Sequence, residues 1–112
     1  MPLNDKYVMT TLAYNSVFSN PDIKFQEGMF FLIGKKNNNT IPRLGITIKK
    51  RDFKLAVKRN ALKRSIKVSF KQVSHKLPAL DYVIIVKASQ ADKEVEREML
   101  RGLWQKCLKI NL

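Results

Sequence analysis

The feature that most constrains the fold is a long segment, residues 54–74, that contains neither glycine nor proline. Its apolar residues recur at steps of three, four or seven, which is the spacing of an amphipathic α-helix. These residues are Leu55, Leu62, Ile66, Phe70 and Val73. An apolar stripe of this length is stable only when it is buried, so the rest of the chain must supply a surface that covers it.

The side of this predicted helix opposite the stripe is uniformly basic. Residues 43–76 hold twelve of the chain's 22 Lys and Arg residues and one acid, Asp52. At about 100° per residue, five polar residues fall on roughly one third of the circumference. We call them the cationic face: Asn60, Lys63, Arg64, Lys67 and Lys71. A solvated face is the alternative interpretation, but such a face normally interleaves Glu with Lys, so one-signed charge favours a polyanionic partner.

The charge of the whole chain points to the same class of partner. A formal net charge of +13 over 112 residues favours nucleic acid first and an anionic membrane second. The longest apolar runs, 29–33 and 82–86, are much shorter than the roughly 18 residues of a membrane-spanning helix. Arg59 lies off the cationic face, near the apolar stripe, and beside Asn60 it offers a planar fork of donors suited to a folded RNA backbone.

The chain has the length of a single domain, residues 1–112. Around the long helix, the patterns predict a short helix (13–18), four strands (23–25, 29–33, 44–48 and 80–86) and a last helix from residue 92 onwards. We expect 29–33 and 44–48 to form a hairpin. Residues 80–86 are nearly all apolar, which is typical of a strand covered on both faces, and strand–helix–strand here suggests a βαβ crossover.

The last helix has a different character from the basic one. Ser89, with Asp92 three residues later, resembles a capping box in front of it. Its apolar side contains Val95, Met99, Leu103 and Cys107. Its charges are mixed, with possible i,i+3 pairs Glu94–Arg97 and Glu98–Arg101. We therefore interpret this helix as scaffold.

Residues for catalysis are scarce. One cysteine, Cys107, and one histidine, His75, cannot form an internal disulfide or a zinc cluster, and we expect the first in the core and the second on the surface. No Gly-rich phosphate loop and no Ser/His/Asp set is present. The first residues resemble no export signal, which predicts a cytoplasmic protein. These features indicate a binding module.

One segment resembles a known family. The residues Lys54, Ala56, Arg59, Asn60, Lys63, Arg64 and Lys67, after a strand ending in 45–50, are similar to the Arg-Asn-x-x-Lys-Arg signature of the protein component of bacterial ribonuclease P. Weaker similarity extends over 14–18, 30–33 and 81–84. The resemblance implies an α+β two-layer sandwich of the ribosomal protein S5 domain 2-like type. It has a four-stranded sheet and three helices in the order α-β-β-β-α-β-α, with a left-handed βαβ crossover.

The resemblance also implies a function. In that family a catalytic RNA removes the 5′ leader of precursor tRNA by Mg²⁺-dependent hydrolysis, and the protein assists. The resemblance implies that the protein alone is inert and that it binds the RNA in a 1:1 complex. The implied RNA contacts are Lys50, Arg51, Lys54, Arg59, Asn60, Lys63, Arg64, Lys67 and Lys71. A cleft between the first helix and the sheet would hold the leader near Tyr14, Phe18 and Ile33, where Tyr14 presents a ring and Phe18 belongs either to the core or to the leader path. Ile33 stands where the family has an aromatic residue.

Two other functions remain open at this stage. A ribosomal or chaperone-like RNA-binding protein could use the same basic helix without any part in processing. A protein nuclease acting alone is a third possibility, from another class.

Overall fold

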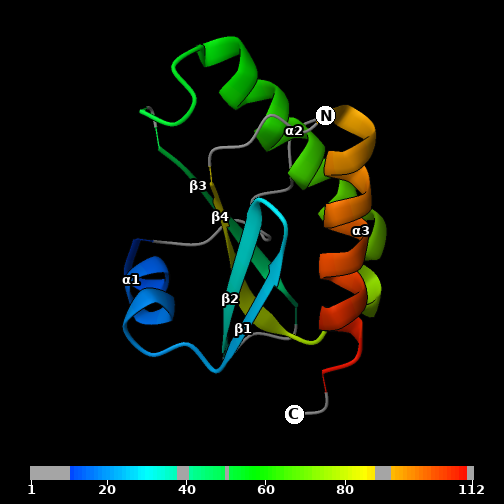
Figure 1. Cartoon of the computed structure of the whole chain (residues 1–112). Helices are drawn as coiled ribbons and strands as arrows, with labels where there is room; N and C mark the ends of the chain where they lie inside the picture. Colours follow the sequence, from blue (N-terminus) through cyan, green and yellow to red (C-terminus); the bar gives the residue numbers. More distant parts are fainter. Residues whose placement is uncertain (1–10, 38–40, 50, 88–91, 111–112) are drawn as a thin grey trace.

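The computed structural model describes residues 11–37, 41–49, 51–87 and 92–110. Its elements are α1 (Thr11–Ser19), β1 (Ile23–Glu27), β2 (Phe30–Lys36), β3 (Arg43–Ile48), α2 (Ala56–Val73), the one-turn 3₁₀ helix η2 (Ser74–Lys76), β4 (Leu80–Val86) and α3 (Lys93–Leu108). The α+β class and the order α-β-β-β-α-β-α are thereby confirmed (Figure 1). No helix in these four described ranges is long and apolar enough to cross a membrane.

The sheet has the order β1-β2-β4-β3. β2 pairs with β1 and β4 in antiparallel fashion, and β3 runs parallel to β4. The expected hairpin between 29–33 and 44–48 is therefore wrong, because β4 lies between those two strands. The true hairpin joins β1 to β2 through Gly28, whose φ of 55° is a conformation that glycine adopts without strain. β4 takes the centre because its apolar side chains need cover on both faces, and α2 connects it to β3 as the predicted βαβ crossover.

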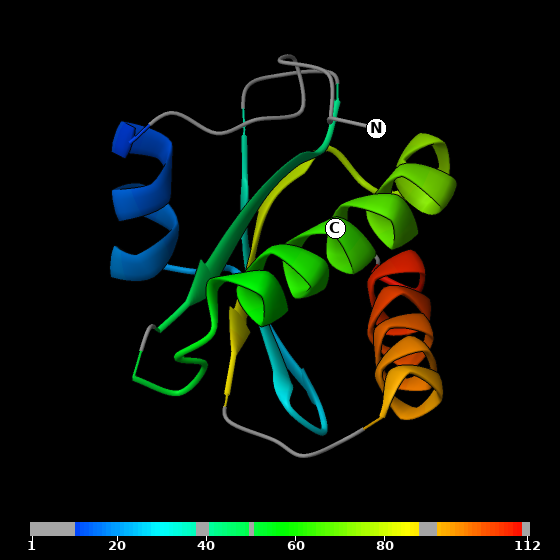
Figure 2. The same ribbon diagram turned by 90° about the horizontal axis from the view of Figure 1, so that it is seen from above.

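Helices cover both faces of the sheet (Figure 2). α2 and α3 pack on one face, where Leu62, Ile66 and Phe70 of α2 meet the sheet and α3 in the main core. α1 packs on the other face, where Val17 is fully buried against Val83. The sheet therefore separates α1 from the body of α2, and both helices are fixed by buried side chains.

The start of α2 differs from the sequence prediction. Leu55, expected in the apolar stripe, is 63% exposed because it precedes the first turn with an extended backbone, as the N-cap residue. Phe53, two residues earlier, is buried instead. Phe53, in the connection between β3 and α2, therefore packs in the core, and the helix begins only at Ala56.

α3 begins at Lys93, and its N-cap is Asp92, whose carboxylate accepts a hydrogen bond from the Val95 backbone N–H at 2.9 Å. The predicted capping box placed Ser89 at the N-cap of this helix, and Ser89 lies outside the described residues. Val95 itself is 42% exposed, whereas Leu103 and Cys107 are buried as expected. The pair Glu98–Arg101 forms, with 3.1 Å between Oε1 and Nη1.

Candidate nucleic-acid interface

The cationic face lies on the outer side of α2, away from the buried residues of that helix. Asn60, Lys63, Arg64 and Lys71 are exposed, and Lys67 is half-buried. Within the described part of the chain, Lys63, Arg64 and Lys67 have no carboxylate within 4.0 Å. The ion pairs that do form involve cations elsewhere, on β3 and α3. The structure therefore brings these side chains together and leaves the positive charge of Lys63, Arg64 and Lys67 without a carboxylate partner.

Arg59 has a different position and a different task. Its Nη1 donates to the backbone carbonyl oxygens of Phe53 at 2.7 Å and Lys54 at 3.0 Å. These hydrogen bonds stabilise the connection between β3 and α2. Lys54 and Arg51, which belong to this connection, are exposed to solvent. Arg59 thus orders the loop that precedes the cationic face. Lys50 lies outside the described residues.

The two aromatic residues of α1 stack on one another, with ring centroids 6.1 Å apart and planes at 16°. Tyr14 is the anchor: its hydroxyl donates to the Ile46 carbonyl oxygen at 3.0 Å, and burial raises the pKa of that hydroxyl. Phe18 is 46% exposed, so the suggestion that it belongs to the core is wrong.

Gly45 explains how Tyr14 comes so close to the sheet. A Cβ at position 45 would lie 2.5 Å from Cζ of the Tyr14 ring, a distance that van der Waals repulsion forbids. The absence of a side chain on β3 therefore makes room for the ring. Sequence periodicity gave no sign of this contact, which joins residues far apart in the chain.

The sheet beside α1 presents half-buried apolar side chains. Ile33 pairs with Val83 and Phe31 with Ile85, and cross-strand partners project from the same face. Lys87 places its Nζ 5.4 Å from the centroid of the Phe31 ring. Tyr14 and Ile33 pack in one small cluster, and Phe18 stacks on Tyr14. The three residues proposed for the leader are therefore brought together.

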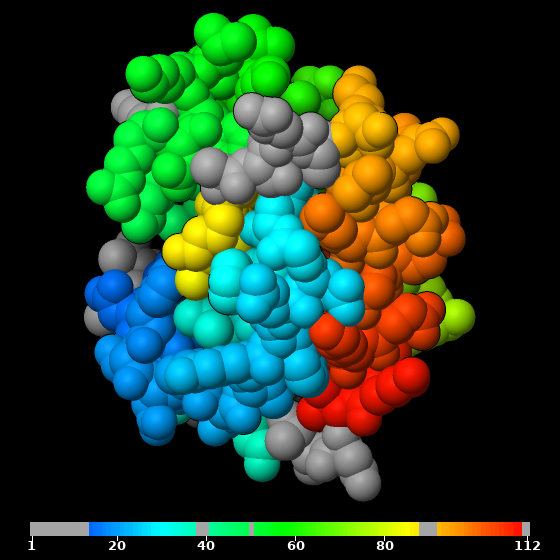
Figure 3. Space-filling view, viewed as in Figure 1, coloured from blue at the N-terminus to red at the C-terminus, as the bar shows by residue number. Residues whose placement is uncertain are grey.

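The surfaces of α1 and of the segment that leads into α2 are both visible on one face of the molecule (Figure 3). On the face that Figure 3 shows, α1 (blue) and the first part of the α2 segment (green) lie on the same side, with α3 (orange to red) on the other. The exposed Phe18 and the exposed Lys54 belong to these two surfaces.

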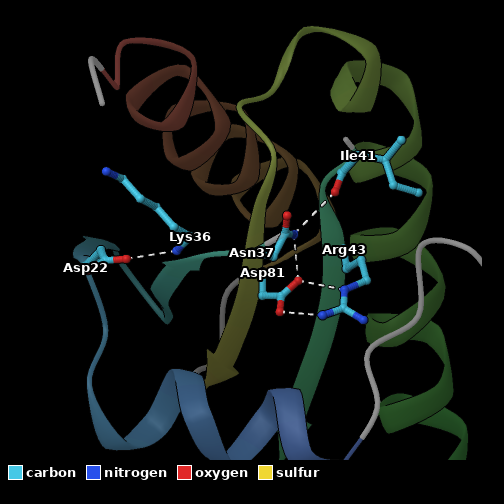
Figure 4. A network of polar contacts seen from close by, with 6 residues as sticks. All are labelled: Asp22, Lys36, Asn37, Ile41, Arg43 and Asp81. Carbon is cyan, nitrogen blue, oxygen red and sulfur yellow. Dashed lines mark hydrogen bonds and ion pairs between the residues drawn. The ribbon is translucent and has the colours of Figure 1, made fainter. Parts of the chain in front are cut away.

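One basic residue of the segment 43–76 is not available to a partner. Arg43 forms a bidentate ion pair with the buried Asp81, with Nε–Oδ1 and Nη2–Oδ2 both at 2.7 Å (Figure 4). Asn37 donates to the same carboxylate at 2.9 Å and to the Ile41 carbonyl oxygen at 3.3 Å. The hydrogen bond to Asp81 raises the pKa of Arg43. Arg43 and Asp81 are register partners on β3 and β4, so this network holds the two strands that α2 connects.

Groups for metal chemistry are not gathered at one place in the part of the chain that the structure describes. Over the described ranges, no three His, Cys, Asp or Glu residues cluster as metal ligands would. Cys107 is buried, as predicted, and burial raises the pKa of its thiol to about 12. His75 is exposed, also as predicted. The surfaces described above can bind and position a polyanion.

Comparison with known proteins gives a consistent result. The family model described as Ribonuclease P matches residues 4–108. A protein named "Ribonuclease P protein component" from Idiomarina loihiensis is 36% identical over 104 residues, which cover 91% of this chain and 83% of the relative. A relative of the same name from Haemophilus influenzae is 31% identical over 105 residues, covering 92% of this chain and 87% of the relative.

Solved structures agree with the fold. The Staphylococcus aureus RNase P protein superposes with a TM-score of 0.79 at 20% identity, covering 88% of this chain and 92% of that one. The Thermotoga maritima RNase P protein, solved in complex with 1-(4-fluorophenyl)-2-thiourea, gives 0.76 at 25% identity, covering 92% of this chain and all of that one.

Proposed function

The chain belongs to the ribonuclease P protein family, and we propose that it binds the catalytic RNA of the holoenzyme together with the 5′ leader of precursor tRNA. In this proposal the RNA carries the hydrolysis and holds the Mg²⁺ that the reaction requires. The protein contributes binding and positioning, in a 1:1 complex. The observation that carries the proposal is the cationic face, where Lys63 and Arg64 are exposed and Lys67 is half-buried. None of the three has a carboxylate partner among the described residues.

The dimensions of α2 suit this role. A helix of 18 residues is about 27 Å long, which matches several successive phosphates of an RNA backbone. Three buried side chains hold the helix on the sheet, so its cations are presented in a fixed line. The guanidinium of Arg64 can hold a phosphate with two parallel hydrogen bonds, whereas Lys63 and Lys67 act as point charges.

Leader binding is proposed for the surface of α1 and the adjoining sheet. Unpaired bases stack on aromatic rings without regard to sequence, at about 1–3 kcal/mol per base. Phe18 offers such a ring because nearly half of its surface is exposed, and Tyr14 supports it from behind by stacking. The roles expected from the sequence are thus exchanged: Phe18 contacts the leader and Tyr14 holds α1 in place.

Reconstitution tests the proposal. The protein is incubated with precursor tRNA and Mg²⁺, with and without a bacterial ribonuclease P RNA, and cleavage of the 5′ leader is followed on gels. We expect no cleavage by the protein alone and faster cleavage in the mixture than with the RNA alone at low Mg²⁺. Cleavage by the protein alone would select an independent nuclease. RNA binding without any effect on cleavage would select a ribosomal or chaperone-like protein.

A further inference from the structure

A groove of about 580 Å³ lies between α2 and α3, at the border of the cationic face. Val68 of α2, which is 45% exposed, forms part of its wall, and the buried side chains of Leu100 and Trp104 of α3 also line it. Its volume is within the range of about 300–1,000 Å³ that is typical of small-molecule sites. The groove can therefore accept a group the size of a base.

The charge around the groove is mostly positive. Four cations contribute to its lining, Arg64 from α2 and three from α3: Lys93, Arg97 and Arg101. Glu96 is the one acid that lines it. Arg101 is paired with Glu98, so among the described residues the positive charge of the groove that no salt bridge offsets comes from Arg64, Lys93 and Arg97. A ligand that carries negative charge at the edge and a flat apolar surface inside would complement this arrangement.

The polar groups of the walls are of two kinds. The Ser69 hydroxyl is already engaged, since it donates to the Ile66 carbonyl oxygen and accepts from the Trp104 indole N–H, each at 2.9 Å. Ser65, Gln72 and Gln105 are exposed. An amide both donates and accepts, so it can pair with the edge of any base.

Arg64 links the groove to the cationic face. It is the only residue of that face among those that line the groove, and it therefore marks the border between the two surfaces. A strand of RNA that follows the cationic face past Arg64 reaches the groove without leaving positive surface. Lys93 and Arg97 of α3, the helix interpreted as scaffold from the sequence, also line this groove.

We propose that the α2–α3 groove receives one unpaired nucleotide of the RNA bound to the cationic face. Its base lies against Val68, and its phosphate contacts Arg97. This proposal rests on the proposed function, because it extends the contact with the catalytic RNA from one helix to two. The occupant is a nucleotide rather than an acidic peptide, because the groove is continuous with the surface that binds RNA phosphates.

A substitution that fills the groove without changing its charge tests the proposal. Val68→Trp places a large side chain in the groove, and Val95→Trp is the control, since Val95 is an exposed valine of α3 (42%) that does not line the groove and lies away from the cationic face. Affinity for ribonuclease P RNA is measured for both, after their folding is checked by thermal unfolding. We expect Val68→Trp to weaken binding about 5- to 140-fold, the range for loss of one stacked base, and Val95→Trp to change it less than twofold.

Photocrosslinking provides a second measurement that does not depend on Val68→Trp. A benzophenone is attached to Gln105→Cys in the groove and, as control, to Lys109→Cys beyond it, while the buried native Cys107 stays unlabelled. We expect the RNA to crosslink at position 105 and not at 109. Crosslinking that is displaced by an acidic peptide but not by a short oligonucleotide would assign the groove to a protein partner and overturn the proposal.

The double variant Lys63→Ala/Lys67→Ala separates the two levels of inference. If it weakens RNA binding while Val68→Trp does not and position 105 fails to crosslink, the groove is not a nucleotide site and the proposed function stands. If neither variant weakens binding, the proposed function itself fails.

Discussion

The cationic face makes a quantitative prediction about salt. Each cation that neutralises a phosphate adds about 0.7–0.9 to the slope of log K against log salt concentration. Lys63, Arg64 and Lys67 have no carboxylate partner in the described structure, so all three are available for such contacts. Replacing the three with Ala should therefore reduce the slope by about 2–3 units.

This change of slope corresponds to a measurable change of affinity. Between 50 and 200 mM salt, the loss of affinity should be roughly 20- to 40-fold smaller for the triple variant than for the unchanged protein. The assay is filter binding of ribonuclease P RNA at several KCl concentrations and constant Mg²⁺. Alanine is favourable in an exposed helix, so folding should be preserved.

The control removes three exposed cations outside this face and outside the groove, Lys24, Lys76 and Lys109. Both variants lose the same net charge. If the control flattens the salt dependence as much as the triple variant does, diffuse charge binds the RNA, and the reasoning from a defined face is refuted.

Three further predictions concern the fold and the leader. Asp81→Ala removes the carboxylate that pairs with the half-buried Arg43 side chain and should cost about 1–3 kcal/mol, seen as a fall of at least about 4 °C in Tm. Arg43→Met with Asp81→Leu should recover most of this loss. Phe18→Ala should lower the ratio of precursor to mature tRNA affinity of the holoenzyme with little effect on Tm, whereas Tyr14→Ala should lower Tm; an unchanged ratio for Phe18→Ala would remove it from the leader path. Cys107 should resist iodoacetamide at pH 9 until the chain is unfolded, because burial raises its pKa to about 12. The unfolded chain ionises this thiol near pH 9, so stability should fall as pH rises from there towards 12.

The position of the cationic face could be predicted from the sequence because helical periodicity is a local property. The pairing of strands is not local, and a hairpin between 29–33 and 44–48 was the simplest interpretation of two adjacent apolar runs. This hairpin does not form because β4 lies between the two strands. The sequence did indicate that β4 is buried on both faces.

Individual side chains were harder to predict than elements. Arg43 counted as one more surface cation, since only tertiary structure brings it to Asp81. Phe53 and Leu55 have similar hydrophobicity, and the exact start of α2 decides which of them is buried. Tyr14 and Phe18 share one side of α1, and the Ile46 carbonyl oxygen and Gly45 determine which of them faces the sheet.

The central place of β4 has a consequence for how the protein is made. β2 and β3 are synthesised long before β4, yet neither can complete its pairing until β4 arrives between them. Contacts between distant parts of a chain form slowly, and domains emerge from the ribosome N-terminus first. The basic segment of α2 is therefore exposed before the sheet that supports it exists. During that interval it is a positively charged segment of nascent chain whose apolar stripe has no sheet to pack against.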